Sequence, residues 1–121
     1  MNSIDWAWVA GLLEGEGCFS FVGAGRYPRI TLQMTDEDIV SRFANYFGVT
    51  CHHRPSKNPK HKDTYQACII KTEKLIECYI ELYPFLGERR RKKLDMFFDC
   101  WKTKHKGIPN MSISYIFKCT H

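Results

Sequence analysis

The sequence predicts an α+β fold, in which helices pack on one face of a four-stranded antiparallel sheet. Two observations lead to this class. Segments with helical periodicity and segments that alternate like strands follow in the order helix, strand, strand, helix, strand, strand, helix, helix. The strands of each pair are joined by a turn-rich or polar stretch. A length of 121 residues fits one domain, so residues 1–121 are expected to form a single domain.

The first helix is unusual because small side chains recur every four residues, at Ala7, Gly11 and Gly15. Each glycine inside a helix costs about 1 kcal/mol relative to alanine, so a compensating contact is expected. Such a stripe favours the close approach of a second helix. Another face of the same helix carries the side chains that can enter the core, which are Trp6, Val9, Ala10 and Leu13.

Two carboxylates, Glu14 and Glu16, lie at the C-terminal end of this helix, and Gly17 is expected to end it. The helix macrodipole is negative there, so a carboxylate is disfavoured unless a cation lies beside it. A divalent metal ion is the natural candidate, because it binds hard carboxylate oxygens.

The remaining elements follow from periodicity and from turn residues. Strands are expected at residues 18–22, 29–35, 49–54 and 64–71. A second helix should end at Gly48, a third should run from Thr72 to the break at Pro84, and a last helix should follow the basic run 89–93. The tail carries an apolar run at residues 113–117 that fits a strand or a helix. The expected helix caps are Ser3 or Asp5, then Thr35 or Asp36, then Thr72.

One strand carries a polar face of the kind that can recognise DNA. Residues 29–35 alternate strictly, with Ile30, Leu32 and Met34 on the core side and Arg29, Thr31 and Gln33 on the other. Arginine and glutamine side chains pair with guanine and adenine in the major groove. The connection at residues 55–63 is polar and lysine-rich, and the net charge of +5 suits an anionic partner. An ordinary solvated face remains the alternative for this strand.

The six cysteines lie in periodic segments without a CxxC pair, so they are expected to be reduced and mostly buried. Zinc ligation by the runs 51–53 and 119–121 is the alternative, although their spacing matches no standard zinc site. No apolar run is long enough to span a membrane, and no signal peptide leads the chain. An intracellular protein that is not secreted and has no membrane partner is therefore expected.

The run from Val9 to Gly17, followed by Cys18-Phe19, resembles the signature of the LAGLIDADG homing endonucleases. The small residues of that signature fall on Gly11 and Gly15, and its acidic positions fall on Glu14 and Glu16. The resemblance covers roughly residues 3–103. It implies an αββαββα domain whose four-stranded sheet is curved like a saddle, with its concave face in the major groove of DNA.

The resemblance also implies a chemistry, the site-specific cutting of both DNA strands with Mg²⁺ or Mn²⁺. It assigns Glu16 as the metal ligand and Gly17 as the source of a backbone carbonyl. The run 32–35 resembles the second-strand segment that keeps a polar active-site residue, which would be Gln33. Pro84-Phe85-Leu86 and the basic run resemble the segment that supplies an active-site lysine. Counting from the proline places Arg89 at that position, and Lys92 could replace it one helical turn later.

Because the chain holds a single copy of the acidic helix, the resemblance implies a homodimer. Ala7, Gly11 and Gly15 would face the partner's helix and bring two Glu16 carboxylates together. A dimer of this symmetry reads a long palindromic or near-palindromic site. The side chains expected to contact DNA are Ser20, Arg26, Arg29, Thr31, Gln33, Arg54, Lys57, Lys60, Lys62 and Gln66.

Two other functions stay open. The first is a LAGLIDADG-like protein that no longer cuts, acting as an intron RNA splicing maturase or a DNA-binding regulator. The second is a metabolic enzyme or a structural module with a glycine-packed helix. Glu14 and Glu16 favour the nuclease, because a purely binding helix has no use for carboxylates at its negative end. Arg89 favours the maturase or regulator, because arginine does not readily lose a proton.

Overall fold

The computed structural model describes residues 1–25 and 27–104. Arg26, the apolar run 113–117 and the run 119–121 lie outside the described residues. The elements are α1 (Ser3–Glu16), β1 (Gly17–Val22), β2 (Tyr27–Met34), α2 (Glu37–Phe47), β3 (His52–Arg54), β4 (Thr64–Ile69), α3 (Thr72–Leu82), the 3₁₀ turn η1 (Tyr83–Phe85) and α4 (Glu88–Lys104). This order confirms the predicted α+β class.

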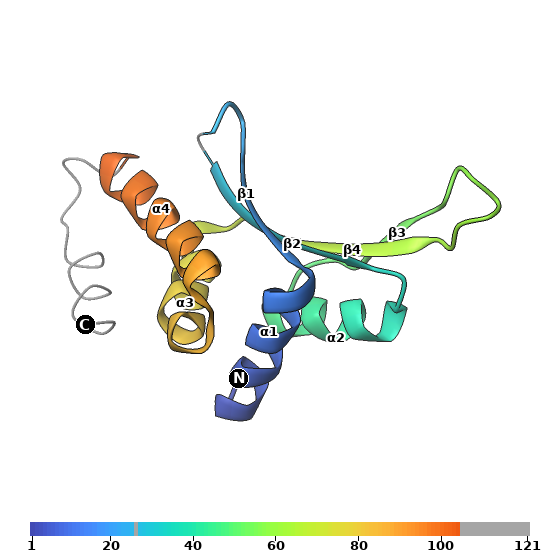
Figure 1. Ribbon diagram of the computed structural model, residues 1–121, viewed down its shortest axis with the longest axis horizontal. Coiled ribbons are helices and arrows are strands. Elements are labelled where there is room, and N and C mark those ends of the chain that lie inside the picture. The colour runs from blue at the N-terminus through green and yellow to red at the C-terminus, as the bar shows by residue number, and fades with distance from the viewer. Residues whose placement is uncertain (26, 105–121) are drawn as a thin grey trace.

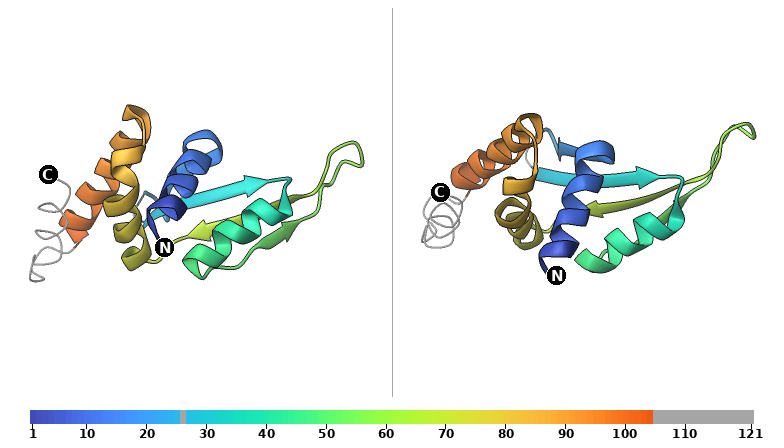
Figure 2. Two further views of the ribbon diagram at one scale, coloured as in Figure 1. Left: turned by 90° about the horizontal axis from the view of Figure 1, so that it is seen from below. Right: turned by 60° about the horizontal axis from the view of Figure 1, so that its bottom comes forward.

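The sheet has four antiparallel strands in the order β1-β2-β4-β3. Two hairpins therefore meet at the centre, where Gly17 pairs with Leu32 on one side and Leu32 pairs with Ala67 on the other. The sheet is curved, and α1 and α2 lie under its convex side (Figure 1). Figure 2 shows α3 and α4 packed beside α1 at the β1 end of the sheet. We call the side of the sheet that faces away from the helices the outer face.

The core lies between the sheet and the helices. Alternation along β2 sends Ile30 and Leu32 inward, where both are fully buried. Val9 and Leu13 of α1 are fully buried beside them, so α1 passes through the middle of the core. Aromatic contacts join α4 to β1, where the ring of Phe97 lies 5.2 Å from that of Phe21. The other large, fully buried side chains are Phe43, Phe47, Ile69, Leu75, Leu82, Leu94 and Trp101.

The helix caps differ from those expected. Asn2, rather than Ser3 or Asp5, caps α1: its side chain accepts from the backbone N–H of Asp5 at 2.9 Å, and Asp5 accepts from the N–H of Asn2 at 3.1 Å. This reciprocal pair is a capping box, so Asp5 acts from inside the first turn. Lys71 precedes α3, and Thr72 is its first residue rather than its cap. Asp36, one of the two expected caps of α2, is at the N-cap position, but its side chain makes no capping hydrogen bond.

Two strands are shorter than expected. The third strand begins at His52 instead of residue 49, because residues 48–49 complete the end of α2. Gly48 takes a left-handed conformation with φ of 63°, and the N–H of Val49 donates to the carbonyl of Ala44 at 3.0 Å. The fourth strand ends at Ile69 instead of Lys71. Within residues 1–25 and 27–104, no helix combines the length and hydrophobicity needed to cross a membrane.

Candidate functional site

The two carboxylates at the end of α1 have different surroundings. Glu14 accepts a hydrogen bond from the backbone N–H of Gly87, and its other oxygen lies 3.5 Å from Nε of Arg90. Arg90 also donates to the main-chain carbonyl of Glu14 at 3.3 Å, and its guanidinium lies 5.2 Å from the ring centre of Phe19. The side chain of Arg90 is only 12% exposed. The protein therefore supplies the cation that Glu14 needs, and this contact joins the end of α1 to the start of α4.

Glu16 is exposed and forms no hydrogen bond or ion pair with any residue that the structure describes. Its neighbour Gly17 holds the sharp change from helix to strand. Gly17 is buried, its N–H donates to the carbonyl of Leu13, and a Cβ at this position would lie 2.7 Å from that carbonyl oxygen. Only glycine fits there, and the turn leaves the Glu16 carboxylate in solvent at the end of the helix.

Gln33 lies near the end of β2, on the side of the sheet where α1 joins β1. Gly17 pairs with Leu32, so the next residue of β2 stands beside the junction between α1 and β1. The side chain of Gln33 is exposed and donates to Oγ1 of Thr64 at 2.9 Å. The register therefore places Gln33 one residue beyond the partner of Gly17, at the end of β2 that faces the junction of α1 and β1.

The basic run of α4 points partly to solvent and partly to the end of α1. Arg89 is exposed in the first turn of α4, and Lys92 is exposed and pairs with Glu88 at 3.3 Å. Arg90 is the cation that reaches the end of α1. Sequence reasoning missed Arg90 and Gly87. The signal for Arg90 was its spacing, because it belongs to the buried stripe of α4 that continues through Leu94, Phe97 and Trp101.

The small-residue stripe of α1 faces solvent in the single chain. Ala7, Gly11 and Gly15 are exposed, and a Cβ added at either glycine would meet no atom within 4 Å. On the same face, Ile4 is 77% exposed, and Trp8 and Leu12 are partly buried. The guanidinium carbon of Arg42 lies 3.9 Å from the ring centre of Trp8. We call residues 4, 7, 8, 11, 12 and 15 the open face of α1.

The outer face of the sheet is concave and carries no helix (Figure 1). Cross-strand contacts establish which side chains lie on it: Arg54 donates to Gln66 at 2.8 Å, and Thr31 lies 3.5 Å from the sulfur of Cys68. Alternation and register place these side chains on the outer face: Cys18, Ser20, Val22, Arg29, Thr31, Gln33, His52, Arg54, Thr64, Gln66 and Cys68. Gln33, Arg54 and Gln66, which the DNA-binding hypothesis names, therefore share the outer face of the sheet.

Thr31 was expected to contact DNA, but its burial leaves little of its side chain for such a contact. It lies on the outer face, but it is only 7% exposed. Its cross-strand neighbours Cys18 and Cys68 flank it on both sides, and its hydroxyl is hydrogen-bonded to Cys68. Ser20 and Arg29 are also cross-strand partners, and Ser20 Oγ and Arg29 Nε are buried without a hydrogen-bond partner among the described residues.

The β3–β4 hairpin projects beyond the sheet and is held at its base (Figure 1). Asp63 accepts from the backbone N–H of Ser56 at 2.8 Å and lies 2.8 Å from Nε2 of His53. The hydrogen bond from Ser56 and then that from His53 lower the pKa of Asp63 below its ordinary value. The ring of His53 stacks on Tyr65 at 5.2 Å. The exposed lysines of this hairpin are Lys57, Lys60 and Lys62.

Metal-ligating side chains do not cluster within the described part of the chain, where no group of three or more His, Cys, Asp or Glu residues could hold a metal ion. In the run 51–53, one of the two considered for zinc, Cys51 is partly buried. The ring of His53 is hydrogen-bonded to Asp63 and stacks on Tyr65. The second run, 119–121, lies outside the described residues. Cys18, Cys51, Cys68 and Cys78 carry free thiols.

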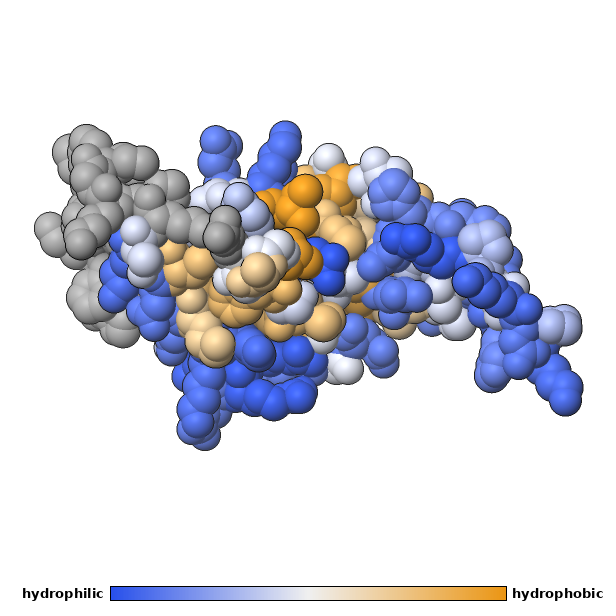
Figure 3. All heavy atoms as spheres, turned by 90° about the horizontal axis from the view of Figure 1, so that it is seen from above, coloured by the Kyte–Doolittle hydropathy of each residue, from blue (hydrophilic) through white to orange (hydrophobic). Residues whose placement is uncertain are grey.

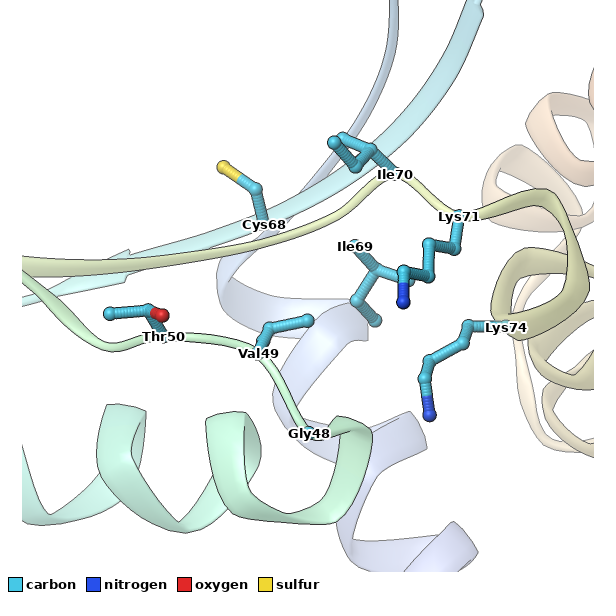
Figure 4. A pocket seen from close by; sticks show the side chains of 8 residues that line it. All are labelled: Gly48, Val49, Thr50, Cys68, Ile69, Ile70, Lys71 and Lys74. Atoms are coloured by element: carbon cyan, nitrogen blue, oxygen red, sulfur yellow. The ribbon is translucent and has the colours of Figure 1, made fainter.

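A pocket of about 260 Å³ lies where the end of α2 meets the end of β4 and the start of α3 (Figure 4). Backbone and apolar side chains such as Val49 and Ile69 line it, and Lys71 and Lys74 are its charged groups. No carboxylate, histidine or hydroxyl pair is among the residues that line it. The residues that line this pocket therefore offer no catalytic arrangement.

Comparison with known proteins finds a relative with a similar sequence. The chain is 31% identical over 85 residues to a probable intron-encoded endonuclease, aI3, of Dictyostelium citrinum. This match covers 69% of the chain and 34% of the relative, so the chain spans about a third of that protein. No protein-family model matches the chain.

The fold of the chain matches the folds of solved homing endonucleases. A homing endonuclease, I-CvuI in complex with its target, matches with a TM-score of 0.60 at 17% identity, over 95% of this chain and 74% of that one. The LAGLIDADG homing endonuclease I-GzeII, in complex with a DNA target, matches with a TM-score of 0.58 at 20% identity, over 99% of this chain and 44% of that one. The chain therefore has the LAGLIDADG homing endonuclease fold, and the resemblance in its sequence is confirmed.

Proposed function

We propose that the protein is a site-specific double-strand DNA endonuclease of the homing type, which acts as a homodimer with a divalent metal ion. The difference between Glu14 and Glu16 is the observation that carries this proposal. Arg90 neutralises Glu14, whereas Glu16 has no partner among the described residues. A carboxylate left without a cation at the negative end of a helix is suited to bind one from solution.

The open face of α1 supports the homodimer. Two glycines inside α1 cost about 1 kcal/mol each, and nothing within the described chain approaches either of them. A second copy of α1 packed on this face would cover Ile4 and let the two backbones approach closely. A two-fold axis there would bring the two Glu16 carboxylates together and orient two identical outer faces along one DNA duplex.

The donor set fits magnesium or manganese, which prefer oxygen ligands. Glu16 would hold the ion through its carboxylate, Gly17 could add a backbone carbonyl, and DNA phosphates and water would complete the shell. When bound, such an ion activates a water molecule and stabilises the leaving 3′ oxygen of the cut strand. Gln33 would hydrogen-bond the attacking water or the phosphate from the same edge of the sheet. Arg89 would stabilise negative charge on the phosphate, but it could not serve as a base.

The outer face and the β3–β4 hairpin support DNA as the substrate. Gln33, Gln66 and Arg54 present amide and guanidinium groups of the kinds that read adenine and guanine. The hairpin lysines extend this surface toward the phosphate backbone. The surface follows the curve of the sheet (Figure 1), which suits a long, near-palindromic site in a major groove. Recognition of an intron insertion site is the use we propose for it.

A splicing maturase or DNA-binding regulator without nuclease activity is the second candidate. The arginine at position 89, where the resemblance implies a lysine, favours it. This candidate would keep the outer face and its DNA or RNA affinity, but no metal-dependent cutting.

The two candidates separate in a cleavage experiment. We would incubate the purified protein with a DNA library of candidate insertion sites and Mg²⁺, beside Glu16→Gln and the control Glu81→Gln, an exposed carboxylate on α3. The proposal expects double-strand cuts by the wild type and the control, and a loss of at least 100-fold in Glu16→Gln with DNA binding kept. Sequence-selective binding without cutting by the wild type would favour the maturase or regulator.

A further inference from the structure

The outer face has two chemically different halves. In the half next to the β3–β4 hairpin, polar side chains are joined by hydrogen bonds: Gln33 donates to Thr64, and Arg54 donates to Gln66. In the other half, apolar groups lie in the middle of the surface (Figure 3). We call Cys18, Cys68 and Ile70 the apolar patch.

Strand register explains how the apolar patch forms. Thr31 pairs with Cys18 of β1 and with Cys68 of β4, so these side chains make one row across three strands. The hydroxyl of Thr31 is hydrogen-bonded within this row to the sulfur of Cys68. Ile70 follows Cys68 by two residues and is 64% exposed. Ile70 therefore lies just past the end of β4, on the same side of the sheet as the exposed Cys18 and the partly buried Cys68 (Figure 4). Together these side chains form an apolar area on the concave face that another molecule can cover.

The surroundings of the apolar patch indicate the kind of molecule. Ile69 pairs with Ile30, so Ile70 stands beside Arg29, whose Nε is buried without a hydrogen-bond partner among the described residues. The hairpin lysines and the net charge of +5 make the whole face attractive to an anion. The occupant must therefore combine negative charge with small apolar groups. The major-groove edge of DNA meets this description, because the thymine methyl is an apolar group on the base edges there.

We infer that the apolar patch reads thymine methyl groups, and that Ile70 is a specificity-determining residue. This inference rests on the proposed function. It assigns A·T pairs to the part of each half-site that faces Cys18, Cys68 and Ile70, and hydrogen-bonded readout to the part that faces Gln33 and Gln66. In a homodimer, the same preference would recur in both half-sites.

Replacement of thymine by deoxyuridine tests the inference, because it removes the methyl and keeps base pairing. A bound duplex is first selected from a randomised double-stranded library, and each thymine is then replaced singly. Burial of one methyl corresponds to about fourfold in affinity (about 0.8 kcal/mol). We expect losses of about three- to fivefold at a few thymines in each half-site and no change at the others.

Two variants link this loss to the apolar patch. Ile70→Ala should bind thymine and deoxyuridine equally at one or more of the sensitive positions. Gln66→Ala, on the same strand and the same face, should bind DNA more weakly but keep the discrimination. Because Ile70 is exposed, its variant should unfold at the wild-type temperature, which circular dichroism would check.

The outcomes separate this inference from the proposed function. A flat deoxyuridine scan, or a preference that persists unchanged in Ile70→Ala, would overturn the inference while DNA binding stands. A wild-type protein that binds no duplex from the library would overturn both the proposed function and the inference.

Discussion

Replacing Glu14 by glutamine should weaken the contact that holds α4 against the end of α1. Glutamine keeps an oxygen for the backbone N–H of Gly87 but removes the charge that faces Arg90. The same substitution should leave Glu16 in place as the candidate metal ligand. Glu14→Gln therefore tests whether the two carboxylates have separate roles.

The size of the effect follows from burial. The side chain of Arg90 is 12% exposed, so its charge loses its partner in a largely desolvated place. The Nε of Arg90 lies 3.5 Å from the carboxylate without a hydrogen bond to it, so the contact is an ion pair. Exposed ion pairs contribute about 0.2–1 kcal/mol, and breaking a buried one costs about 3–5 kcal/mol. The side chain of Glu14 is 40% exposed and therefore screened by solvent, which places the loss between these values, at about 1–2 kcal/mol. For a chain of this length, that corresponds to a decrease of about 4–8 °C in Tm.

A double-mutant cycle with Arg90→Leu measures the pair directly. Leucine suits position 90 because that position lies on the buried stripe of α4. Urea unfolding of the wild type, both single variants and the double variant should give a coupling of about 1–2 kcal/mol. The exposed pair of Glu88 and Lys92 serves as a control and should couple by less than about 0.5 kcal/mol.

Two results would refute this reasoning. The first is additivity of the Glu14 and Arg90 effects, which would mean that the ion pair does not stabilise the junction of α1 and α4. The second is a Glu14→Gln variant whose folded form loses metal-dependent cleavage as completely as Glu16→Gln does. That result would make Glu14 a metal ligand instead of a structural residue.

Three further predictions concern the dimer, the hairpin and acid stability. Gly11→Leu should give a monomer by light scattering with little change in Tm measured on the monomer, because no described atom lies within 4 Å of a Cβ at that position. Replacing the hairpin lysines by glutamine should reduce the slope of log Kd against log salt by up to about 0.9 for each lysine that contacts a phosphate, in binding titrations. The pKa of Asp63 is lowered in the folded protein, so its contribution is present above the ordinary value of 3.8 and is lost as pH falls through the folded pKa. Asp63→Asn should therefore weaken the hairpin most at neutral pH and least at low pH, as measured by hydrogen exchange corrected for pH.

The sequence predicted the order of elements because each signal was local. Alternation along residues 29–35 required only neighbouring residues, and Ile30 and Leu32 are fully buried as that period demands. The stripe of small residues on α1 likewise required only the helical repeat. The predicted start of the third strand, at residue 49, was wrong. The left-handed Gly48 and the hydrogen bond from Val49 to Ala44 complete the C-terminal end of α2, so β3 begins only at His52.

Two features depended on contacts that sequence spacing does not contain. Thr31 alternates onto the outer face, but its burial comes from a central strand with Cys18 on one side and Cys68 on the other. Arg90 was missed because counting from Pro84 emphasised Arg89 and ignored the buried stripe of α4. The contact of Arg90 with Glu14 joins residues that are 76 positions apart in the chain. Such a pair emerges only from the packing of α4 against α1.

Two features of α1 have no partner among the described residues: the glycines of its open face and the carboxylate of Glu16. One face of α1 is buried in its own core through Val9 and Leu13, while the open face with Gly11 and Gly15 is uncovered. One carboxylate at its end is paired with Arg90, while Glu16 is unpaired among the described residues. An uncovered helix face calls for a second helix, and a lone carboxylate supplies too little charge for a metal site. In the proposed homodimer, a two-fold axis beside α1 would meet both needs at once, because the contact that covers the open face would also bring the second Glu16 beside the first.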